Sequence, residues 1–289
     1  MTTFLTPGRC YVIAEIGPNW CVSRNVNDNF EELTRLVNVA HEAGADAVKV
    51  QLKSLNGYYS RENLDTPITD PRSPFATRRE YVMAREPTAF ILKLLSQVCR
   101  EVGIRWGASP WDQPSVDLLG RFEVPWVKVA SASLTDDALL RAVAAIGKPV
   151  ILSTGMSTMD EVAHAIEVLG TDDLVLLSCT STYPCDPDEI NLRCIDTLRE
   201  RFGVPVGYSG HETGLSPTFA AAVMGACVVE RHITMDRSQW GPDHAASLEP
   251  EGLRRLVRDI RLFERARGDG VKRVWASEEA ARKRLRRVG

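Results

Sequence analysis

The chain has 289 residues, of which 44% are hydrophobic and 25% are charged, an ordinary composition for a globular protein. Its net charge of −3 gives no general reason to expect nucleic acid as a partner, and we find neither a signal-peptide pattern nor an apolar run of membrane-spanning length. The seven cysteines include no CxxC pair, which argues against a disulfide framework or a zinc ribbon. We therefore expect a cytoplasmic protein with reduced thiols and no membrane partner.

Short β-type runs alternate with amphipathic segments along the chain. The runs are apolar and bounded by Gly or Pro, which is typical of parallel strands buried on both faces. Eight such runs occur, at residues 10–17, 46–52, 104–110, 126–131, 149–155, 174–179, 204–210 and 227–235. The clearest helical segments between them are residues 29–45, 89–103, 158–170 and 215–226.

This alternation predicts a (β/α)₈ TIM barrel, an α/β fold, as a single domain. We expect the barrel to cover residues 1–267 and a short basic C-terminal tail to cover residues 268–289. A doubly wound open sheet is the alternative. Its Gly-rich fingerprint is missing after the first strand, where the sequence reads AEIGPNW.

The longest interruption of the periodicity is the segment 54–87, which follows the second predicted strand. A barrel enzyme carries long loops over its substrate at this position. The segment could instead be a disordered surface insertion. Its two adjacent tyrosines and several arginines favour a substrate lid.

Polar residues occupy the carboxyl ends of all eight predicted strands, where this fold builds its active site. In chain order they are Glu15, Lys49, Gln51, Ser109, Lys128, Ser131, Ser153, Thr154, Ser181, Tyr183, Ser209, His211, Glu230 and His232. Singly, each has an ordinary explanation, such as a salt bridge for a lysine. Helix capping is the better explanation for Thr135 and Ser157, which directly precede predicted helices. Polar groups at every strand end are costly to bury unless they converge on a polar ligand, so we predict one polar site at this face.

The residue types indicate the chemistry of this site. Lys49 and Lys128 should face each other across the barrel mouth, and because two buried ammonium groups repel, they predict an anionic ligand that keeps both charged. Serines on neighbouring strands add donors suited to phosphate and carboxylate oxygens. His211 and His232, on adjacent strands, are placed to share a divalent metal that could polarise a substrate carbonyl.

The motifs resemble those of the sialic acid synthase family over residues 10–267. In order they read AEIGPN, GADAVKVQ, ASP, VKVASAS, ILSTGMST, CTSTYPCDPDEINLR, VGYSGHETG, ERHITMDR and GPDHAASLEP. The resemblance implies condensation of phosphoenolpyruvate with a sugar aldehyde, typically N-acetylmannosamine, to give a 2-keto-3-deoxy sugar acid and phosphate by C–O cleavage. It also implies a divalent metal ion, Mn²⁺ before Mg²⁺ or Co²⁺, and a homodimer.

The resemblance assigns a role to each residue at the strand ends. Phosphate binding falls to Lys49, Ser131, Ser181 and Ser209. Binding of the donor's carboxylate falls to Lys128, Ser109 and Ser153. Metal binding falls to His211 and His232, and contacts to the acceptor sugar fall to Gln51, Tyr183 and Asp243. Glu15 matches an acidic residue that handles water or a substrate hydroxyl, so the catalytic group comprises Glu15, Lys49, Lys128 and His211.

The chain departs from the family pattern mainly where the acceptor would lie. Trp20 stands where the family has His, and Ser133 stands where an acid is usual. Because an unpaired polar group there costs roughly 1–3 kcal/mol, we expect an acceptor other than N-acetylmannosamine. At the donor end, Ser109 and Ser181 replace Thr and Asn conservatively. Family members usually continue into a small C-terminal antifreeze-like domain, which we expect to be absent because the chain stops at Gly289.

Two other interpretations stay open. A Schiff-base aldolase could use Lys49 or Lys128 as its nucleophile, although this leaves the histidine pair without a role. A barrel without catalytic activity could bind a sugar phosphate or a partner chain. Such a binder would not need to activate a carbonyl group. The presence of Glu15 together with two lysines and two histidines therefore argues against it.

Overall fold

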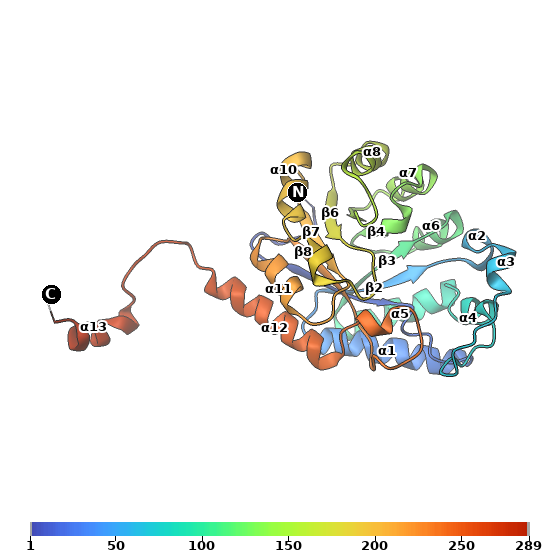
Figure 1. Cartoon of the computed structure of the whole chain (residues 1–289), viewed down its shortest axis with the longest axis horizontal. Coiled ribbons are helices and arrows are strands. Elements are labelled where there is room, and N and C mark those ends of the chain that lie inside the picture. The colour runs from blue at the N-terminus through green and yellow to red at the C-terminus, as the bar shows by residue number, and fades with distance from the viewer. Residues whose placement is uncertain (1, 288–289) are drawn as a thin grey trace.

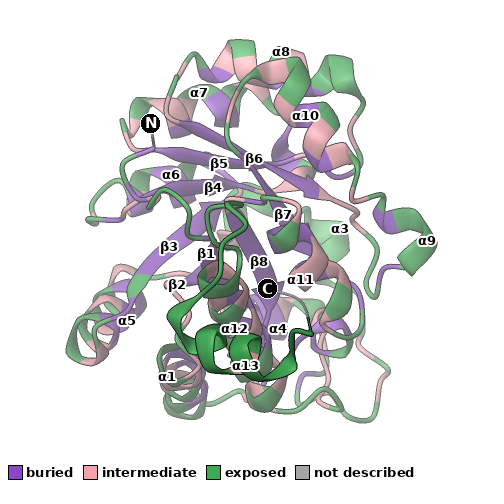
Figure 2. Cartoon of the chain, turned by 90° about the vertical axis from the view of Figure 1, so that its left-hand side faces the viewer, coloured by how far each residue is buried: buried purple, intermediate pink, exposed green. Residues whose placement is uncertain are grey.

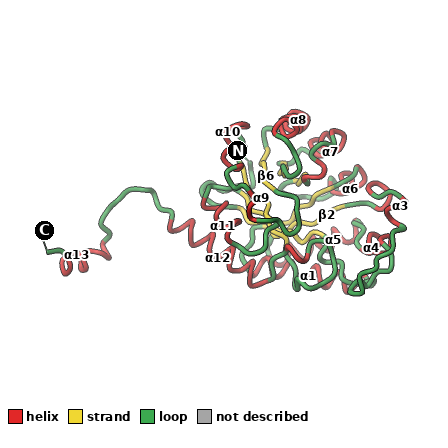
Figure 3. The backbone as a smooth tube through the Cα atoms, in the orientation of Figure 1, coloured by secondary structure: helices red, strands yellow, loops and turns green. Residues whose placement is uncertain are grey.

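The computed structural model describes residues 2–287 and shows eight parallel strands closed into a barrel, with β8 pairing back onto β1. The strands are β1 (Tyr11–Gly17), β2 (Ala47–Leu52), β3 (Arg105–Pro110), β4 (Val127–Val129), β5 (Val150–Ser153), β6 (Leu174–Cys179), β7 (Val206–Gly210) and β8 (Val228–His232). Helices surround the strands (Figure 1; Figure 3). The predicted (β/α)₈ barrel is confirmed, and the open sheet is wrong.

Each strand is followed by helical structure before the next begins. The helices are α1 (Val26–Glu42), α2 (Leu55–Tyr58), α3 (Arg61–Leu64), α4 (Arg78–Ala84), α5 (Ala89–Val102), α6 (Gln113–Leu119), α7 (Asp137–Ala145), α8 (Met159–Leu169), α9 (Pro187–Ile190), α10 (Cys194–Phe202), α11 (Ser216–Val223), α12 (Pro250–Ala266) and α13 (Glu279–Leu285). The N-caps of α7 and α8 are Asp136 and Thr158. The predicted caps Thr135 and Ser157 are therefore wrong by one residue, because each lies next to a second residue that caps equally well.

Alternate residues of the strands point to opposite faces and form two hydrophobic cores. One core lies between the sheet and the helices, and the other fills the barrel interior. The interior core includes Ile13, Ile151 and the fully buried Trp126. Figure 2 shows the buried strands at the centre of the molecule. The interior of the barrel is therefore filled by side chains.

The segment 54–87 is folded. It contains α2, α3 and α4, and its residues Phe75 and Tyr81 are buried against Cys21 in a small hydrophobic cluster. This contradicts the alternative of a disordered insertion. The segment packs beside the end of β2, as a substrate lid would require, while its role as a lid stays a prediction.

The residues after α12 leave the barrel. Residues 268–287 are almost all exposed, and Figure 1 shows α13 standing away from the barrel. The division into a barrel (1–267) and a basic tail (268–289) stays a prediction, and residues 1 and 288–289 lie outside the described part. Among the described residues, no helix combines the length and apolar character needed to cross a membrane.

We predict that Gly107→Ala destabilises the barrel. Gly107 lies in β3 against Trp126, and an added Cβ would lie 2.5 Å from Cη2 of that indole, inside its van der Waals surface. Because the interior is closely packed, we expect a loss of about 1–3 kcal/mol in the free energy of unfolding, measured in urea. In the control Gly120→Ala, φ is −59° and the added Cβ makes only an ordinary contact at 3.5 Å, so stability should not fall. Equal stability of both variants would contradict this account of the interior.

Candidate active site

The polar residues of the strand ends meet in one cavity of about 240 Å³ at the barrel mouth. The predicted site residues that line it are Glu15, Lys49, Gln51, Ser109, Lys128, Ser131, Ser153, Ser181, Tyr183, Ser209, His211 and His232. Asp243 is outside this lining, but its Oδ2 lies 3.5 Å from Nδ1 of His232. The structure therefore brings together the residues to which the resemblance gave a role, with Asp243 at the edge. Thr154, which was also predicted at a strand end, is outside the lining, and its hydroxyl donates to the carbonyl of Leu177 at 3.0 Å.

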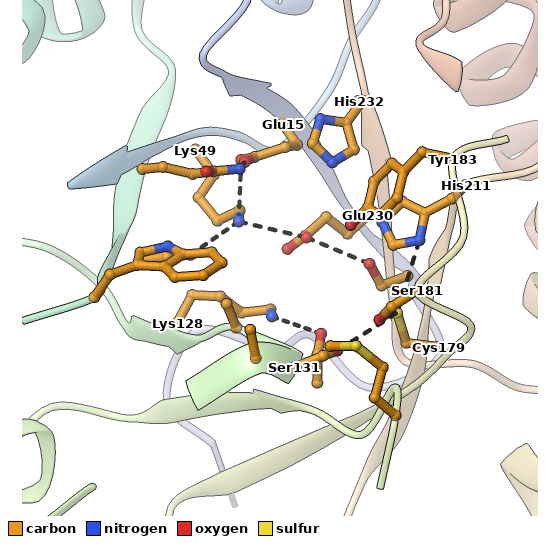
Figure 4. A pocket seen from close by; sticks show the side chains of 18 residues that line it. Glu15, Lys49, Lys128, Ser131, Cys179, Ser181, Tyr183, His211, Glu230 and His232 are labelled. Carbon is orange, nitrogen blue, oxygen red and sulfur yellow. Dashed lines mark hydrogen bonds and ion pairs between the residues drawn. The ribbon is translucent and has the colours of Figure 1, made fainter. Parts of the chain in front are cut away.

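Lys49 is held by two buried carboxylates. Its Nζ lies 3.1 Å from Oε2 of Glu15 and 3.5 Å from Oε1 of Glu230, and it donates to Oγ of Ser109 at 2.9 Å. Figure 4 shows the ammonium group between the two acids. The expectation that both lysines need an external anion to stay charged is wrong for Lys49, because the barrel register places Glu15 beside it.

These buried charges shift the pKa values of one another. Burial alone would lower the pKa of Lys49, but the charges of Glu15 and Glu230 outweigh it and raise the pKa. Burial raises the pKa of Glu15, and Lys49 offsets this only in part. Burial would also raise the pKa of Glu230, but Lys49 and Lys128 together hold it below its ordinary value. Glu15 is thus the carboxyl group in this cluster that most readily accepts a proton.

Lys128 has no such counter-charge. Its Nζ donates to Oγ of Ser153 at 2.6 Å and to the carbonyl of Val129 at 3.0 Å, and no described carboxylate lies within 4.0 Å of it. Burial lowers its pKa to about 8, although Glu230 offsets part of the effect. Near neutral pH the site therefore holds one buried cation that lacks a direct ionic partner.

Serine hydroxyls surround this cation and the end of β5. Oγ of Ser131 accepts from the backbone N–H of Gly155 at 3.1 Å, and a Cβ on Gly155 would meet Oγ of Ser181 and that of Ser131. The backbone thus approaches both hydroxyls closely, as a cradle for an oxyanion requires. Ser109 contacts Lys49 and not Lys128, with which the resemblance had grouped it.

The two imidazoles lie side by side at one end of the cavity. Their ring centroids are 5.5 Å apart, with the planes inclined by 45°, and Tyr183 stacks on His211 at 4.0 Å. Nδ1 of His211 lies 2.7 Å from the carbonyl of Thr180, to which it donates, so that Nε2 is the atom available to a ligand. Nδ1 of His232 is buried and has no hydrogen-bond partner.

These features fit a divalent metal bound by two imidazoles. Burial, followed by the charges of His211 and Lys49, lowers the pKa of His232, which keeps its ring in the neutral form that binds metals. The described residues contain no group of three or more His, Cys, Asp or Glu side chains arranged for a metal. The chain would thus supply two ligands and leave the other positions to substrate and water.

The sequence-based assignment missed several residues of the cavity. Glu230 was placed at the end of the last strand without a role, although its spacing of two residues from His232 puts both on one face of β8. Cys179 and Trp111 also line the cavity. Cys179 begins the motif CTSTYPCDPDEINLR but was given no role, and Trp111 lies outside every motif quoted above. Burial would raise the pKa of the Cys179 thiol, but its hydrogen bond with His211 and the charge of that ring lower it.

Known proteins resemble this chain over almost its whole length. Residues 36–272 match the NeuB family. N-acetylneuraminate-9-phosphate synthase of Homo sapiens is 36% identical, over 97% of this chain and 79% of that protein. N,N'-diacetyllegionaminic acid synthase of Legionella pneumophila is also 36% identical, over 96% and 79%.

A solved structure of the same kind of synthase is also similar to this chain. The N-acetylneuraminic acid (sialic acid) synthetase of Leptospira borgpetersenii superposes with a TM-score of 0.78 at 29% identity, over 97% of this chain and 93% of that one. The motifs, the barrel and both kinds of comparison lead to the same conclusion. This chain belongs to the NeuB family.

Proposed function

We propose that the protein condenses phosphoenolpyruvate with a sugar aldehyde to give a 2-keto-3-deoxy, sialic-acid-like sugar acid and inorganic phosphate. C3 of phosphoenolpyruvate forms a bond with the aldehyde carbon, and the aldehyde oxygen takes up a proton. Water adds at C2 and releases a proton. The C2 hydroxyl then loses its proton as the C2–O bond to phosphate breaks, which leaves a ketone.

The observation that carries this proposal is the unbalanced charge of Lys128 among serine hydroxyls. A small dianionic or trianionic donor would supply the missing counter-charge, and the hydroxyls of Ser131, Ser153 and Ser181 would donate to its oxygens. Lys49 already has carboxylate partners, so it binds the donor as part of a cluster whose net charge is small.

Glu15 has the properties of the group that handles the water proton. Its carboxyl is fully buried, accepts from Nε2 of Gln51 at 3.0 Å, and has a raised pKa, all of which suit a proton acceptor that works near neutral pH. Lys49 beside it would stabilise the carboxylate before the proton transfer and would orient it. Gln51 occupies the acceptor side of the cavity.

His211 and His232 are the residues that would hold a divalent ion, with Mn²⁺ preferred and Mg²⁺ or Co²⁺ as alternatives. Such an ion, when bound, polarises the acceptor's carbonyl group. The Thr180 carbonyl orients His211, and Tyr183 covers its ring, so the ring position is set by the chain itself. Homodimerisation and a cytoplasmic location stay predictions.

The acceptor is a sugar aldehyde whose identity differs among the relatives. Their names specify N-acetylneuraminate-9-phosphate, N,N'-diacetyllegionaminic acid and pseudaminic acid as products. Trp20 and Ser133 are both buried, and Trp20 lies beside Gln51. An acceptor other than N-acetylmannosamine therefore remains our proposal.

We predict that His211→Ala and His232→Ala each lower phosphate release by at least about 100-fold, a larger effect than the loss of an outer-shell group. The assay supplies phosphoenolpyruvate, Mn²⁺ and a panel of aldehydes, with products identified by mass spectrometry. Calorimetry with Mn²⁺ should show weakened binding in both variants. The control His164→Gln changes an exposed residue of α8 that pairs with Asp137, and it should keep full activity.

Full activity of His211→Ala, or activity that survives EDTA, would contradict the metal role. The Schiff-base alternative would use Lys128, because burial lowers its pKa to about 8. Covalent trapping of substrate by borohydride would favour that alternative over the proposed condensation.

We predict that the affinity for phosphoenolpyruvate falls as the pH rises above about 8, because Lys128 then loses its proton in the ligand-free protein. Below this pH Lys128 is already charged, so its titration should no longer change the affinity. Lys128→Met should bind roughly 10- to 100-fold more weakly at pH 7, and its affinity should depend less on pH above 8. Calorimetry from pH 7 to 9.5 measures both effects.

The control for this experiment is Lys148→Met, which removes a surface ion pair with Glu123. Its affinity should follow that of the native protein at every pH. A parallel decline in the native protein and in Lys128→Met would show that another group is responsible.

A further inference from the structure

The residue that directly follows His211 is a buried acid, Glu212. It is fully removed from solvent and is not among the residues that line the catalytic cavity. Its Oε2 accepts from the hydroxyl of Tyr208 at 2.9 Å. Its Oε1 accepts from the backbone N–H of Thr218 at 3.2 Å and from the hydroxyl of that residue at 2.5 Å. Both oxygens of the carboxylate are therefore held by groups outside the cavity.

Arg231 is the ionic partner of this carboxylate. Its Nη1 lies 3.0 Å from Oε1 of Glu212, and both side chains are almost completely buried. The same guanidinium donates to the backbone carbonyl of Glu212 at 2.6 Å and to that of Gly214 at 2.9 Å. Arg231 directly precedes His232 in β8. It therefore connects the strand that carries one imidazole with the turn that carries the other.

Gly210 leaves room for this contact. It directly precedes His211 and pairs with Arg231 in the ladder between β7 and β8. A Cβ at this position would lie 2.5 Å from Oε2 of Glu212 and 2.9 Å from Oγ1 of Thr218, so no larger residue fits without displacing them. The carboxylate thus packs against the backbone on the N-terminal side of His211, which restricts where that histidine can lie.

His211 is also held from the side of β6. Its backbone carbonyl accepts from the N–H of Cys185 at 3.0 Å, and its ring is oriented by the carbonyl of Thr180. The centroids of the two imidazoles are 5.5 Å apart. One ion can bind both rings only while this spacing is kept. The spacing depends on where the backbone places His211 and His232.

Stability alone does not explain the buried ion pair. Burying two charges requires their desolvation, and well-packed apolar side chains of similar volume are often at least as stable. A buried pair can instead select one arrangement of the chain, because its hydrogen bonds are satisfied in that arrangement only. The arrangement that Arg231 and Glu212 select is the position of the turn after β7 relative to β8.

We propose that Glu212 and Arg231 are positioning residues, and that their ion pair sets the separation of His211 and His232 and thereby the affinity for the divalent ion. Neither residue lines the cavity, so they act through the two histidines and not on a substrate. This inference rests on the proposed function, because it takes both imidazoles as metal ligands. Groups that hold metal ligands in place commonly change metal affinity by about 10- to 100-fold.

The first experiment measures Mn²⁺ binding by calorimetry. Glu212→Gln removes the charge that pairs with Arg231, and Thr218→Val removes one hydrogen bond to the carboxylate but keeps the ion pair. We expect Mn²⁺ to bind at least about 10-fold more weakly to Glu212→Gln and roughly 2- to 10-fold more weakly to Thr218→Val. Phosphoenolpyruvate, titrated without metal, should bind both variants with native affinity, because Lys128 and the serines are unchanged.

The matched control is Thr34→Val, which removes a hydroxyl that bonds to a backbone carbonyl within α1 and should change neither affinity. Native Mn²⁺ affinity in Glu212→Gln and Thr218→Val would overturn the proposal. Equal weakening of Mn²⁺ and phosphoenolpyruvate binding would also overturn it, because that result indicates a general loosening of the barrel. If Glu212→Gln does not fold, Thr218→Val decides the test.

The visible absorption spectrum of the Co²⁺-loaded protein gives a second readout, because it reports the coordination of the ion without turnover. The spectra of Glu212→Gln and Thr218→Val should differ from that of the native protein, whereas Thr34→Val should keep the native spectrum. Identical spectra in all the variants would contradict a positioning role.

The variants His211→Ala and His232→Ala separate this inference from the proposed function. If neither weakens Mn²⁺ binding, the imidazoles are not metal ligands, so the metal role in the proposed function fails and this inference fails with it. If both weaken Mn²⁺ binding while Glu212→Gln and Thr218→Val bind it as the native protein does, only the positioning role of the ion pair is refuted.

Discussion

The site depends on the way that the barrel buries four charges at its mouth. Glu15, Lys49, Lys128 and Glu230 are almost completely removed from solvent, where an unpaired charge is very unfavourable. Lys49 bridges the two carboxylates, and this leaves Lys128 with only neutral partners. The resulting imbalance favours an anion next to Lys128 and keeps a protonatable carboxyl, Glu15, beside it. Donor binding and proton transfer thus arise from the same set of contacts.

A second buried network, on the outer face of the strands, supports the histidine end. Arg231 lies between Glu230 and His232 on β8, so its side chain points to the opposite face. Its guanidinium bonds the Glu212 carboxylate at 3.0 Å, the Glu212 carbonyl at 2.6 Å and the carbonyl of Gly214 at 2.9 Å. These bonds hold the turn that follows His211. β8 therefore positions one histidine directly and the other through Arg231.

Lys53 and Arg85 are two further cations that the fold places close together, beside Gln51. Lys49 is neutralised internally, while Lys128, Lys53 and Arg85 lack carboxylate partners within 4.0 Å in the described residues. Lys128 lies among the serines of the catalytic cavity, whereas Lys53 and Arg85 lie against aromatic rings, where the Asp243 carboxylate raises the pKa of both.

The local sequence pattern was sufficient to predict the strands. A parallel strand that is buried on both faces requires an apolar run, and the turn at its end is marked by Gly or Pro. By itself, then, the sequence determined the barrel, the strand-end residues and the histidine pair. It could not separate Lys49 from Lys128, which occur in the similar runs AVKVQ and WVKVAS, because ionic partners come from other strands through the register. Nor could it relate Arg85 to Lys53, since 31 residues, which include three short helices, separate them in sequence. Only the tertiary structure decided which charges are neutralised, because burial and pairing depend on residues that are distant along the chain.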